Sequence, residues 1–217
     1  MTTAVGVFAR APSSIGKTRL APHLSPARLR ALRAALLADT LGAVASLTSV
    51  FLFFTPDEAE QEVASLAGRA IPCVPQRGAD LGARMLGAVR HLLEDHRYDA
   101  ALLVGSDIPL VTANHFREAT DTLQAGGGLV LGPSDDGGYY LIGMTQPHAP
   151  LFDGIAWGGE SVLADTLRTA ERIGVEARLV RRAYDVDTFD DLLRLERDLA
   201  WTPAGVSPAV RRWFSAE

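Results

Sequence analysis

The chain has 217 residues, of which 47% are apolar, carries a formal net charge of −5 and contains a single cysteine. This length and apolar content suffice for a sizeable core, built as one large α/β domain or, as the alternative, as two small ones. The acidic balance argues against a binder of nucleic acid or of an anionic membrane, and the lone cysteine excludes an internal disulfide and fits a reducing cytoplasm. No apolar run approaches the ~18 residues of a membrane span, and the N-terminus lacks a signal-peptide pattern. We therefore expect a cytoplasmic protein that contacts neither nucleic acid nor membrane.

Strand-like and helix-like patterns alternate along most of the chain. Short apolar runs predict strands over 4–9, 49–55, 70–75, 98–107, 128–134 and 139–144, and a strand-like stretch over 176–187. Apolar residues at helical spacing predict helices over 25–46, 57–68, 79–96, 113–124, 160–174 and 188–201. This alternation predicts an α/β fold with a mainly parallel sheet that helices cover on both faces.

The last residues differ in composition from the rest of the chain. Residues 201–217 are rich in proline and small residues, and we expect them to form a surface tail on a single domain that spans 1–200. Trp213 and Phe214 in this tail would dock either on the body of that domain or on a second subunit. The sequence therefore leaves a monomer and a homodimer both open.

Ligands of such sheets bind at the carboxyl ends of the strands, so the polar residues that follow apolar strands are candidates for a site. The stretch "APSSIGKT" (11–18) after the first strand resembles a phosphate-binding P-loop, with Ala11 where the first glycine belongs. A P-loop must run directly into a long helix, which Pro22 and Pro26 prevent, because proline inside a helix costs about 3 kcal/mol or more. The sequence instead predicts a flexible loop that presents Lys17 and Arg19 to phosphates; the alternative is two solvated surface cations.

Two further strands end in aspartates. Asp107 in "LLVGSDIPLV" lies at the tip of an apolar strand, and Asp187 in "YDVDTFDDL" lies at the end of the strand-like stretch, where Asp185 points the same way. Two unpaired carboxylates about 4 Å apart would cost about 4 kcal/mol at an effective dielectric of 20, and a hard divalent cation removes that cost. The pair Asp107 and Asp187 therefore predicts an Mg²⁺ or Mn²⁺ site; for Asp107 alone, the N-cap of a short turn is the alternative.

The segment "GPSDDGGYYLIG" (132–143) places a Gly-Gly pair at the mouth of a strand. Glycine in a strand costs about 0.5–1 kcal/mol relative to alanine, so Gly137 and Gly138 need a reason. One reason is a tight hairpin or bulge, and the other is a substrate that comes close to the backbone, with Asp136 binding its hydroxyl or amine. Trp157 in "IAWGGES" offers a flat face that closes the same pocket or, alternatively, packs in the core.

Six motifs together resemble the GT-A-type nucleotide-diphospho-sugar transferase superfamily: "FARAPSSIGKTRLAP", "GADLGARM", "VGSDIPLV", "GPSDDGGYYLIG", "IAWGGESVLADT" and "DVDTFDDLLRLE". Within it, the chain resembles the bacterial glycosyltransferase-like "transferase 1" group associated with radical SAM and selenium-domain genes, from about residue 4 to residue 199. More distantly it resembles phospholactate and molybdenum-cofactor guanylyltransferases. It departs from their glycine-rich "G-G-x-G-x-R" loop by having "RAPSSIGK".

The resemblance implies a Rossmann-like three-layer α/β/α sandwich of the GT-A kind, with a mainly parallel mixed sheet. It implies that Asp107 and Asp187 hold the metal and that Lys17, Arg19 and Asp107 act in catalysis. The positions implied for the nucleotide are Ala9, Arg10, Ala11, Lys17, Arg19, Asp80, Gly82 and Ser106. The positions implied for the second substrate are Asp136, Gly137, Gly138, Tyr139, Trp157, Gly158 and Glu160.

Three functions remain open at this point. The first is a metal-dependent nucleotidyltransferase that moves a nucleotidyl group from a nucleoside triphosphate to a small phosphorylated or phosphonylated acceptor and releases pyrophosphate. The second is a glycosyltransferase that uses a nucleotide-sugar donor, and the third is a non-catalytic nucleotide-binding regulatory module. The paired cations of the loop favour a triphosphate and hence the first, whereas a complete carboxylate pair argues against the third.

Overall fold

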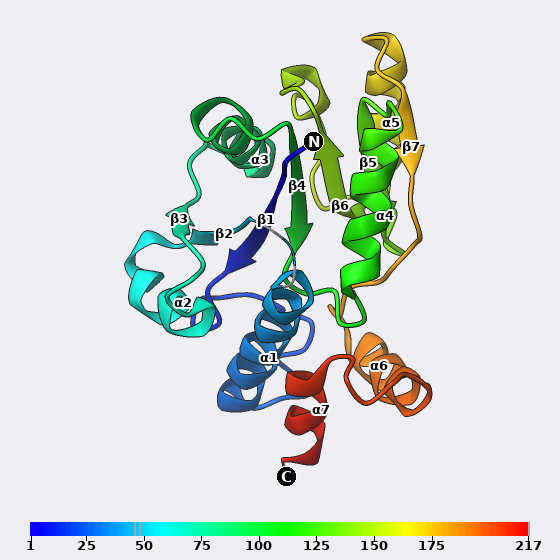
Figure 1. Ribbon diagram of the computed structural model, residues 1–217. Coiled ribbons are helices and arrows are strands. Elements are labelled where there is room, and N and C mark those ends of the chain that lie inside the picture. Colours follow the sequence, from blue (N-terminus) through cyan, green and yellow to red (C-terminus); the bar gives the residue numbers. More distant parts are fainter. Residues whose placement is uncertain (46, 48, 217) are drawn as a thin grey trace.

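A mixed sheet of seven strands forms the centre of the protein (Figure 1). In the computed structural model, which describes residues 1–45, 47 and 49–216, the strands are β1 (Thr3–Arg10), β2 (Val50–Thr55), β3 (Cys73–Pro75), β4 (Ala100–Gly105), β5 (Leu129–Pro133), β6 (Tyr139–Met144) and β7 (Ala177–Leu179). Their order is β3-β2-β1-β4-β6-β5-β7, and β6 runs antiparallel to both of its neighbours while the other pairings are parallel. The predicted α/β class with a mainly parallel mixed sheet is confirmed.

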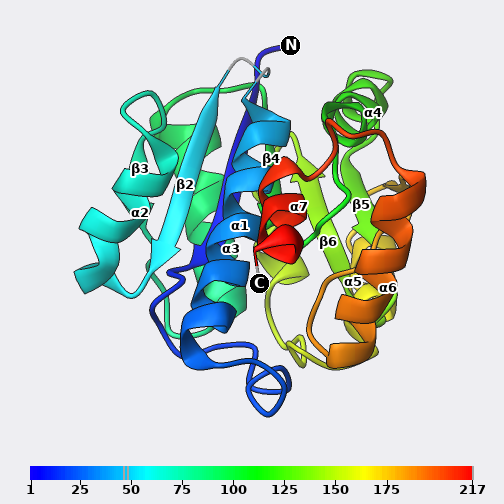
Figure 2. The ribbon, with the colours of Figure 1, turned by 90° about the horizontal axis from the view of Figure 1, so that it is seen from below.

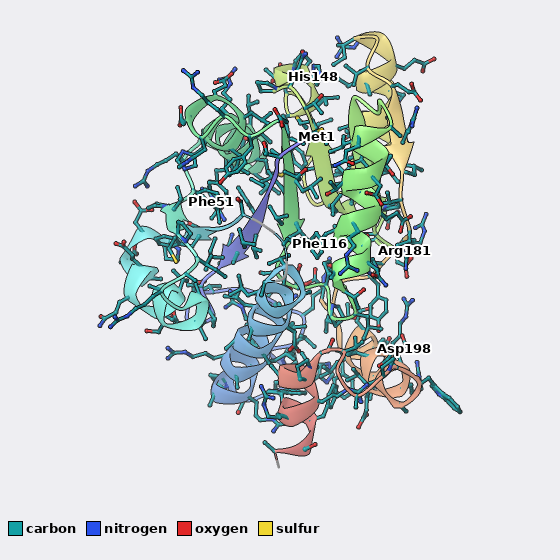
Figure 3. All side chains as sticks on the ribbon, in the orientation of Figure 1. Met1, Phe51, Phe116, His148, Arg181 and Asp198 are labelled. Atoms are coloured by element: carbon teal, nitrogen blue, oxygen red, sulfur yellow. The ribbon has the colours of Figure 1, made fainter. Side chains whose placement is uncertain are left out.

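Helices cover both faces of this sheet. They are α1 (Pro26–Val44), α2 (Glu60–Ala67), α3 (Leu81–Arg90), α4 (Ala113–Gln124), α5 (Val162–Arg172), α6 (Phe189–Trp201) and α7 (Pro208–Ser215), with shorter helical turns at Asp57–Ala59, His91–Asp95 and Ala149–Leu151. One apolar core joins α1, α2 and α4 to one face, and a second joins α3 and α5 to the other. Figure 3 labels a buried side chain from each core, Phe116 of α4 and Phe51 of β2. Among the described residues, no helix combines the length and the apolar character needed to cross a bilayer.

Helix α1 begins where its sequence predicts. Ser25 is the N-cap, its hydroxyl accepts from the backbone N–H of Arg28 (3.3 Å), and Pro26 occupies the first turn, where its missing N–H is not needed. Residues 11–25 form turns and no helix, so the P-loop geometry is absent from this segment. The predicted end of this helix at Ser46 lies outside the described residues.

Two of the predicted strands are shorter in the structure. The strand predicted over 70–75 is reduced to Cys73–Pro75, and the stretch predicted over 176–187 pairs only at Ala177–Leu179, followed by a single bridge between Ala183 and Ser134. These strands lie at the two edges of the sheet, where only one neighbour supplies hydrogen bonds. Beyond β7 the chain leaves the sheet and crosses to α1 through residues 180–188.

The C-terminal residues form a helix rather than an irregular tail. Helix α7 packs on α1 (Figure 2), and the carboxylate of Asp39 on α1 accepts the first two free N–H groups of α7, from Ala209 and Val210, both at 2.8 Å. The Trp213 side chain is 7% exposed, and its indole N–H donates to the Arg28 carbonyl (3.0 Å). Trp213 therefore docks on α1 of the same chain and not on a second subunit.

Candidate functional site

The carboxyl ends of β1 and β4 bring two loops together because these strands are parallel neighbours. The β1 loop carries Lys17, and Asp107 lies two residues after β4 ends at Gly105. The crossing segment 180–188 reaches the same place, guided by the Ala183 N–H, which donates to the Pro133 carbonyl (3.0 Å), and by the Val186 N–H, which donates to the Asp107 carbonyl (3.3 Å). Residues about 80 and 170 positions apart along the chain thus meet at one edge of the sheet.

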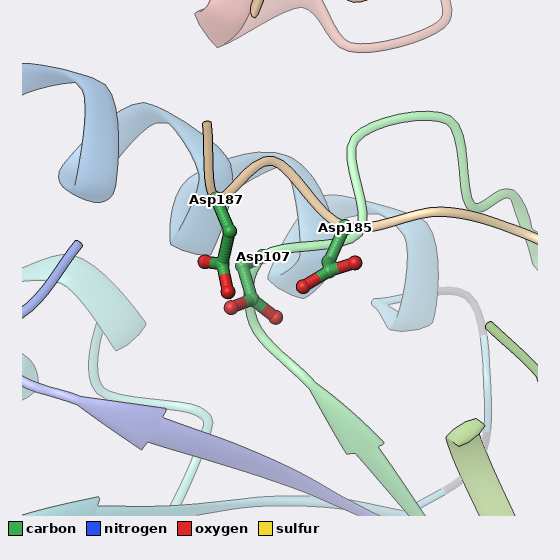
Figure 4. Close-up of side chains that lie close together, drawn as sticks. All are labelled: Asp107, Asp185 and Asp187. Atoms are coloured by element: carbon green, nitrogen blue, oxygen red, sulfur yellow. The ribbon is translucent and has the colours of Figure 1, made fainter. Parts of the chain in front are cut away.

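Three carboxylates converge at this edge. Asp107, Asp185 and Asp187 each offer an oxygen atom within 4.8 Å of the others, and Figure 4 shows their side chains turned toward one another. The local sequence fixes Asp187: Thr188 caps α6, and the Asp191 carboxylate accepts from the N–H groups of Thr188 (2.7 Å) and Asp187 (3.1 Å). The expected approach of Asp107 and Asp187 is present, and Asp185 makes the pair a triad.

Lys17 inserts its ammonium group into this triad. Its Nζ donates to Asp187 Oδ1 (2.9 Å), Asp107 Oδ2 (3.2 Å) and the Val186 carbonyl (2.7 Å), and the side chain is 8% exposed. The backbone of Lys17 has φ +48°, a left-handed conformation that costs a non-glycine residue free energy. The predicted phosphate-facing lysine therefore lies on the carboxylates, at the place where we expected a divalent cation.

The ionisation of the cluster reflects its crowding. Burial, then the charges of Asp107, Asp187 and Asp136, raise the pKa of Asp185 to about 7. For Lys17, burial lowers the pKa, but the two carboxylates that bind it raise the pKa by more, so the net change is upward and the side chain stays charged. Oxygen ligands of this kind, three carboxylates and one carbonyl, are those that Mg²⁺ and Mn²⁺ accept.

A polar cavity of about 280 Å³ opens beside Lys17 under the β1 loop. Arg10, Lys17 and Arg33 supply its positive charge, and Ser106, Asp107 and Asp187 line the other side. Arg33 is 9% exposed, and its guanidinium donates to the carbonyls of Pro12 (2.9 Å), Ser14 and Arg10 (3.3 Å). Arg33 therefore holds the loop in shape, while burial and the nearby Arg10 lower its pKa.

A second cavity, of about 310 Å³ and with a mostly apolar lining, also borders Asp107. Its walls include Phe8, Met85, Tyr139 and Trp157, and the rings of Tyr139 and Trp157 meet edge to face at 6.3 Å. Phe8 and Asp107 line both cavities, so Asp107 forms part of the boundary between them.

The two glycines of the β5–β6 hairpin have different surroundings. Gly137 has φ +88°, and a Cβ there would lie 2.2 Å from the Glu160 carbonyl oxygen, so this glycine serves the fold and not the substrate approach that we expected. Gly138 lines the apolar cavity, and its N–H donates to Asp136 Oδ1 (2.9 Å). A tight hairpin therefore accounts for Gly137, while a close approach of substrate to Gly138 stays a prediction.

The remaining predicted positions divide between the cavities and the scaffold. Tyr139, Trp157 and Gly158 line the apolar cavity, whereas Ala9 and Ala11 are buried in the core and Glu160 is exposed outside both cavities. Asp80 is the N-cap of α3 and accepts from the Ala83 N–H (2.8 Å). Gly82 lets Trp157 approach α3, since a Cβ there would meet its indole nitrogen at 2.7 Å. Arg19 is exposed and lines neither cavity among the described residues.

Arg33 and Asp185 belong to the site but were not assigned to it from the sequence. A signal exists for Arg33: it falls four residues after Leu29 and three before Leu36, so it shares their buried face of α1. Asp185 was recognised as pointing the same way as Asp187, and its distance to Asp107 depends on the crossing segment, which no periodicity predicts.

Several solved structures share this architecture. A protein described as a candidate nucleotide-diphospho-sugar transferase from Desulfovibrio desulfuricans G20 is 29% identical, with a TM-score of 0.88 over 98% of this chain and 95% of that one. The 4-diphosphocytidyl-2C-methyl-D-erythritol synthase of Anaerococcus prevotii DSM 20548 matches in fold at 12% identity and a TM-score of 0.61, over 92% of this chain and 96% of its own.

Glucosyl-3-phosphoglycerate synthase of Mycobacterium tuberculosis, whose structure contains Mn²⁺ and uridine diphosphate, matches in fold at 11% identity and a TM-score of 0.54, over 92% of this chain and 77% of its own. No curated protein matches the sequence. A family model for an uncharacterized protein conserved in bacteria matches residues 37–159, more than half of the chain. The chain therefore belongs to this bacterial family, DUF2064.

Proposed function

We propose that this protein is a metal-dependent transferase that uses a nucleotide, and that its first activity is nucleotidyl transfer from a nucleoside triphosphate. The observation that carries the proposal is the triad of Asp107, Asp185 and Asp187 with Lys17 among its carboxylates, at the carboxyl edge of the sheet. The fold similarity to nucleotidyl and glycosyl transferases supports the reaction class. The narrower grouping with radical SAM and selenium-domain genes stays a prediction.

The charges around the two cavities suggest where each part of the substrates binds. Phosphates fit the polar cavity, where Arg10 and Lys17 supply positive charge, and the residues of the triad would hold Mg²⁺ or Mn²⁺. When bound there, the ion would neutralise the carboxylates and stabilise the charge of the leaving phosphates. Lys17 would then donate to phosphate oxygens instead of carboxylates. A role for Arg19 at the phosphates remains a prediction and requires the loop to move.

In this reaction, an acceptor oxygen attacks the α-phosphorus and the bond from that phosphorus to the β-phosphate oxygen breaks, which releases pyrophosphate. Asp136, at the rim of the apolar cavity, would accept the proton that the acceptor hydroxyl loses. Lys17 would stabilise the charge that develops on pyrophosphate, a contribution that in comparable sites is about 2.7–4 kcal/mol.

Glycosyl transfer is the second candidate, and the apolar cavity favours it. In a nucleotide-sugar donor, the sugar lies directly beyond the diphosphate, and Tyr139 and Trp157 offer aromatic faces at that position. An acceptor oxygen would then bond to the anomeric carbon of the sugar while the bond from that carbon to the diphosphate oxygen breaks, and the nucleoside diphosphate would leave.

The decisive experiment measures pyrophosphate release from nucleoside triphosphates and sugar transfer from nucleotide sugars, each with and without Mn²⁺. Thermal shift identifies the nucleotide first, because a ligand at 100 times its dissociation constant adds about 2.7 kcal/mol to stability. We expect Asp187→Asn to abolish the Mn²⁺-dependent shift and Asp190→Asn, an exposed acid in the first turn of α6, to leave it unchanged. Binding without turnover of any donor would favour the regulatory module, and no Mn²⁺-dependent binding of any nucleotide would refute the proposal.

A further inference from the structure

Among the residues that the structure describes, the charged side chains that line the apolar cavity are all acidic, although the neighbouring polar cavity is the one proposed to bind phosphates. Three carboxylates, those of Asp107, Asp136 and Asp185, reach its lining. Within the described part of the chain, no lysine, arginine or histidine lines it. An anionic group inside this cavity would therefore meet no positively charged side chain, and with a divalent cation neutralising Asp107 and Asp185 it would still meet the carboxylate of Asp136.

Three cations that border the neighbouring cavities, Lys17, Arg182 and Arg194, bind carboxylates. Lys17 binds Asp107 and Asp187 from the side of the polar cavity. Arg182 and Arg194 face a separate cavity of about 290 Å³, where the Asp135 carboxylate lies 2.7 Å from Arg194 Nη1 and 3.6 Å from Arg182 Nη1. The chain thus places positive charge in two other cavities, and among the described residues none lines the apolar cavity itself.

The rest of the lining describes the body of the ligand. Aromatic and aliphatic side chains, among them Phe8, Met85, Tyr139 and Trp157, form the walls, and the volume of about 310 Å³ suits a small organic molecule. Burial raises the pKa of Tyr139, so its phenol stays neutral. The carboxylate of Asp136 is exposed at the rim, where it can accept hydrogen bonds from hydroxyl or amine groups.

We infer that the group that fills the apolar cavity is an alcohol or sugar of zero or positive charge that presents an apolar face. This inference rests on the proposed transferase function, and it replaces the phosphorylated or phosphonylated acceptor that the sequence predicted. The hydroxyl or amine groups of this ligand bind Asp136 and Asp185, and its apolar face packs on Trp157 and Tyr139. All phosphate groups of the substrates stay in the polar cavity.

The test uses matched triples of compounds that share one carbon skeleton and differ in charge. Glucose, glucosamine and glucose 6-phosphate form one triple; 2-phenylethanol, 2-phenylethylamine and phenethyl phosphate form another. Binding is measured by calorimetry on the full chain, with and without Mn²⁺ and the nucleotide that thermal shift identifies. We expect the phosphorylated member to bind at least about tenfold more weakly than its neutral or amine counterpart in at least one triple. A phosphorylated member that binds most tightly, or no measurable binding in either triple, overturns the inference.

Two variants of adjacent residues assign the preference to the cavity. Asp136→Asn keeps the side-chain oxygen that accepts from the Gly138 N–H and removes the charge, so the preference against phosphate should shrink several-fold. Asp135→Asn removes the same charge from the neighbouring residue, which faces the other cavity, and should leave the preference unchanged. Equal effects of both variants would show that general charge, and not the cavity, sets the preference.

The outcome for the inference is separate from the outcome for the proposed function. Nucleotide binding with Mn²⁺ tests the polar cavity and the triad, whereas the difference between Asp136→Asn and Asp135→Asn in the triples tests the apolar cavity. Failure of the nucleotides to bind would refute the proposed function even if the charge preference holds, and nucleotide binding with a preference for phosphorylated compounds would refute only this inference.

Discussion

The two cavities that meet at Asp107 select their ligands by different physical means. The polar cavity is shaped by fixed charges, with Arg33 holding the loop and Lys17 lying among carboxylates, and it has little apolar wall. The apolar cavity is shaped by packed side chains from β1, α3, β6 and the 157–159 loop, and the charged side chains that line it, among the described residues, are aspartates. Because Asp107 lines both cavities, one residue can serve the recognition of charge in one and of shape in the other.

The largest effect is expected for Asp107→Asn, which changes the shared wall. Loss of this carboxylate removes one ligand of the predicted metal site and one partner of Lys17, so turnover should fall by about 10³ or more. Calorimetric titration with Mn²⁺ and a turnover assay measure the effect. Wild-type turnover in this variant would contradict the role of Asp107 in both cavities.

Lys17→Met tests the polar cavity alone, and its two readouts should move in opposite directions. The methionine keeps the unbranched stem, is one heavy atom shorter and removes the ammonium that competes with a divalent cation, so Mn²⁺ alone should bind more tightly. Turnover should fall by about 10²–10³, because the charge of the leaving phosphates loses its partner. Weaker binding of Mn²⁺ to this variant would show that the ammonium does not occupy the metal position.

The two hairpin glycines are expected to differ in role, Gly137 in the fold and Gly138 at the apolar cavity. Gly137→Ala forces a left-handed residue against the Glu160 carbonyl, and we expect Tm to fall by roughly 5 °C or more with the binding of the remaining folded protein unchanged. Gly138→Ala places a Cβ 3.2 Å from Asp136 Oδ1, at the edge of the apolar cavity, and should weaken binding of the second substrate several-fold with a smaller loss of Tm. Thermal melts and binding constants for both variants separate the two roles; a reversed pattern would contradict them.

The smallest effect concerns pH. The pKa of Asp185 is about 7 in the folded protein and 3.8 without the fold, so between these values the folded protein holds a proton that the unfolded chain has released. The free energy of unfolding of the metal-free protein should therefore fall as pH rises from about 4 to about 7. Mn²⁺ should bind more tightly over the same rise, by up to about tenfold per pH unit below pH 6, and the increase should level off above pH 7. Asp185→Asn should flatten both dependences, which melts and Mn²⁺ titrations at several pH values can measure.

The sequence is informative for the site where the sheet dictates geometry. Asp107 follows an apolar strand, and Asp187 precedes a helix with a capping sequence, so both positions were predictable from periodicity and capping alone. The strand order was not predictable in the same way, because β6 enters between β4 and β5 through contacts that no local pattern encodes.

Where loops decide the geometry, the sequence is less informative. A role of Lys17 at phosphates stays a prediction; what the sequence did not indicate is that its left-handed backbone and the Val186 carbonyl place its ammonium on the aspartates. The helix α7 was missed because its stability comes from packing Trp213 on α1 and from the Asp39 carboxylate, both distant in sequence. Tertiary contacts of this kind outweigh the local signals of proline and small residues.

The two outermost strands, β3 and β7, have three residues each. Edge strands this short offer few unpaired backbone N–H and C=O groups, and Pro75 has no backbone N–H to donate. Another polypeptide would find little to pair with along either side, so copies of this chain are not expected to associate by continuing the sheet into a larger one, and any self-association would have to rely on side chains.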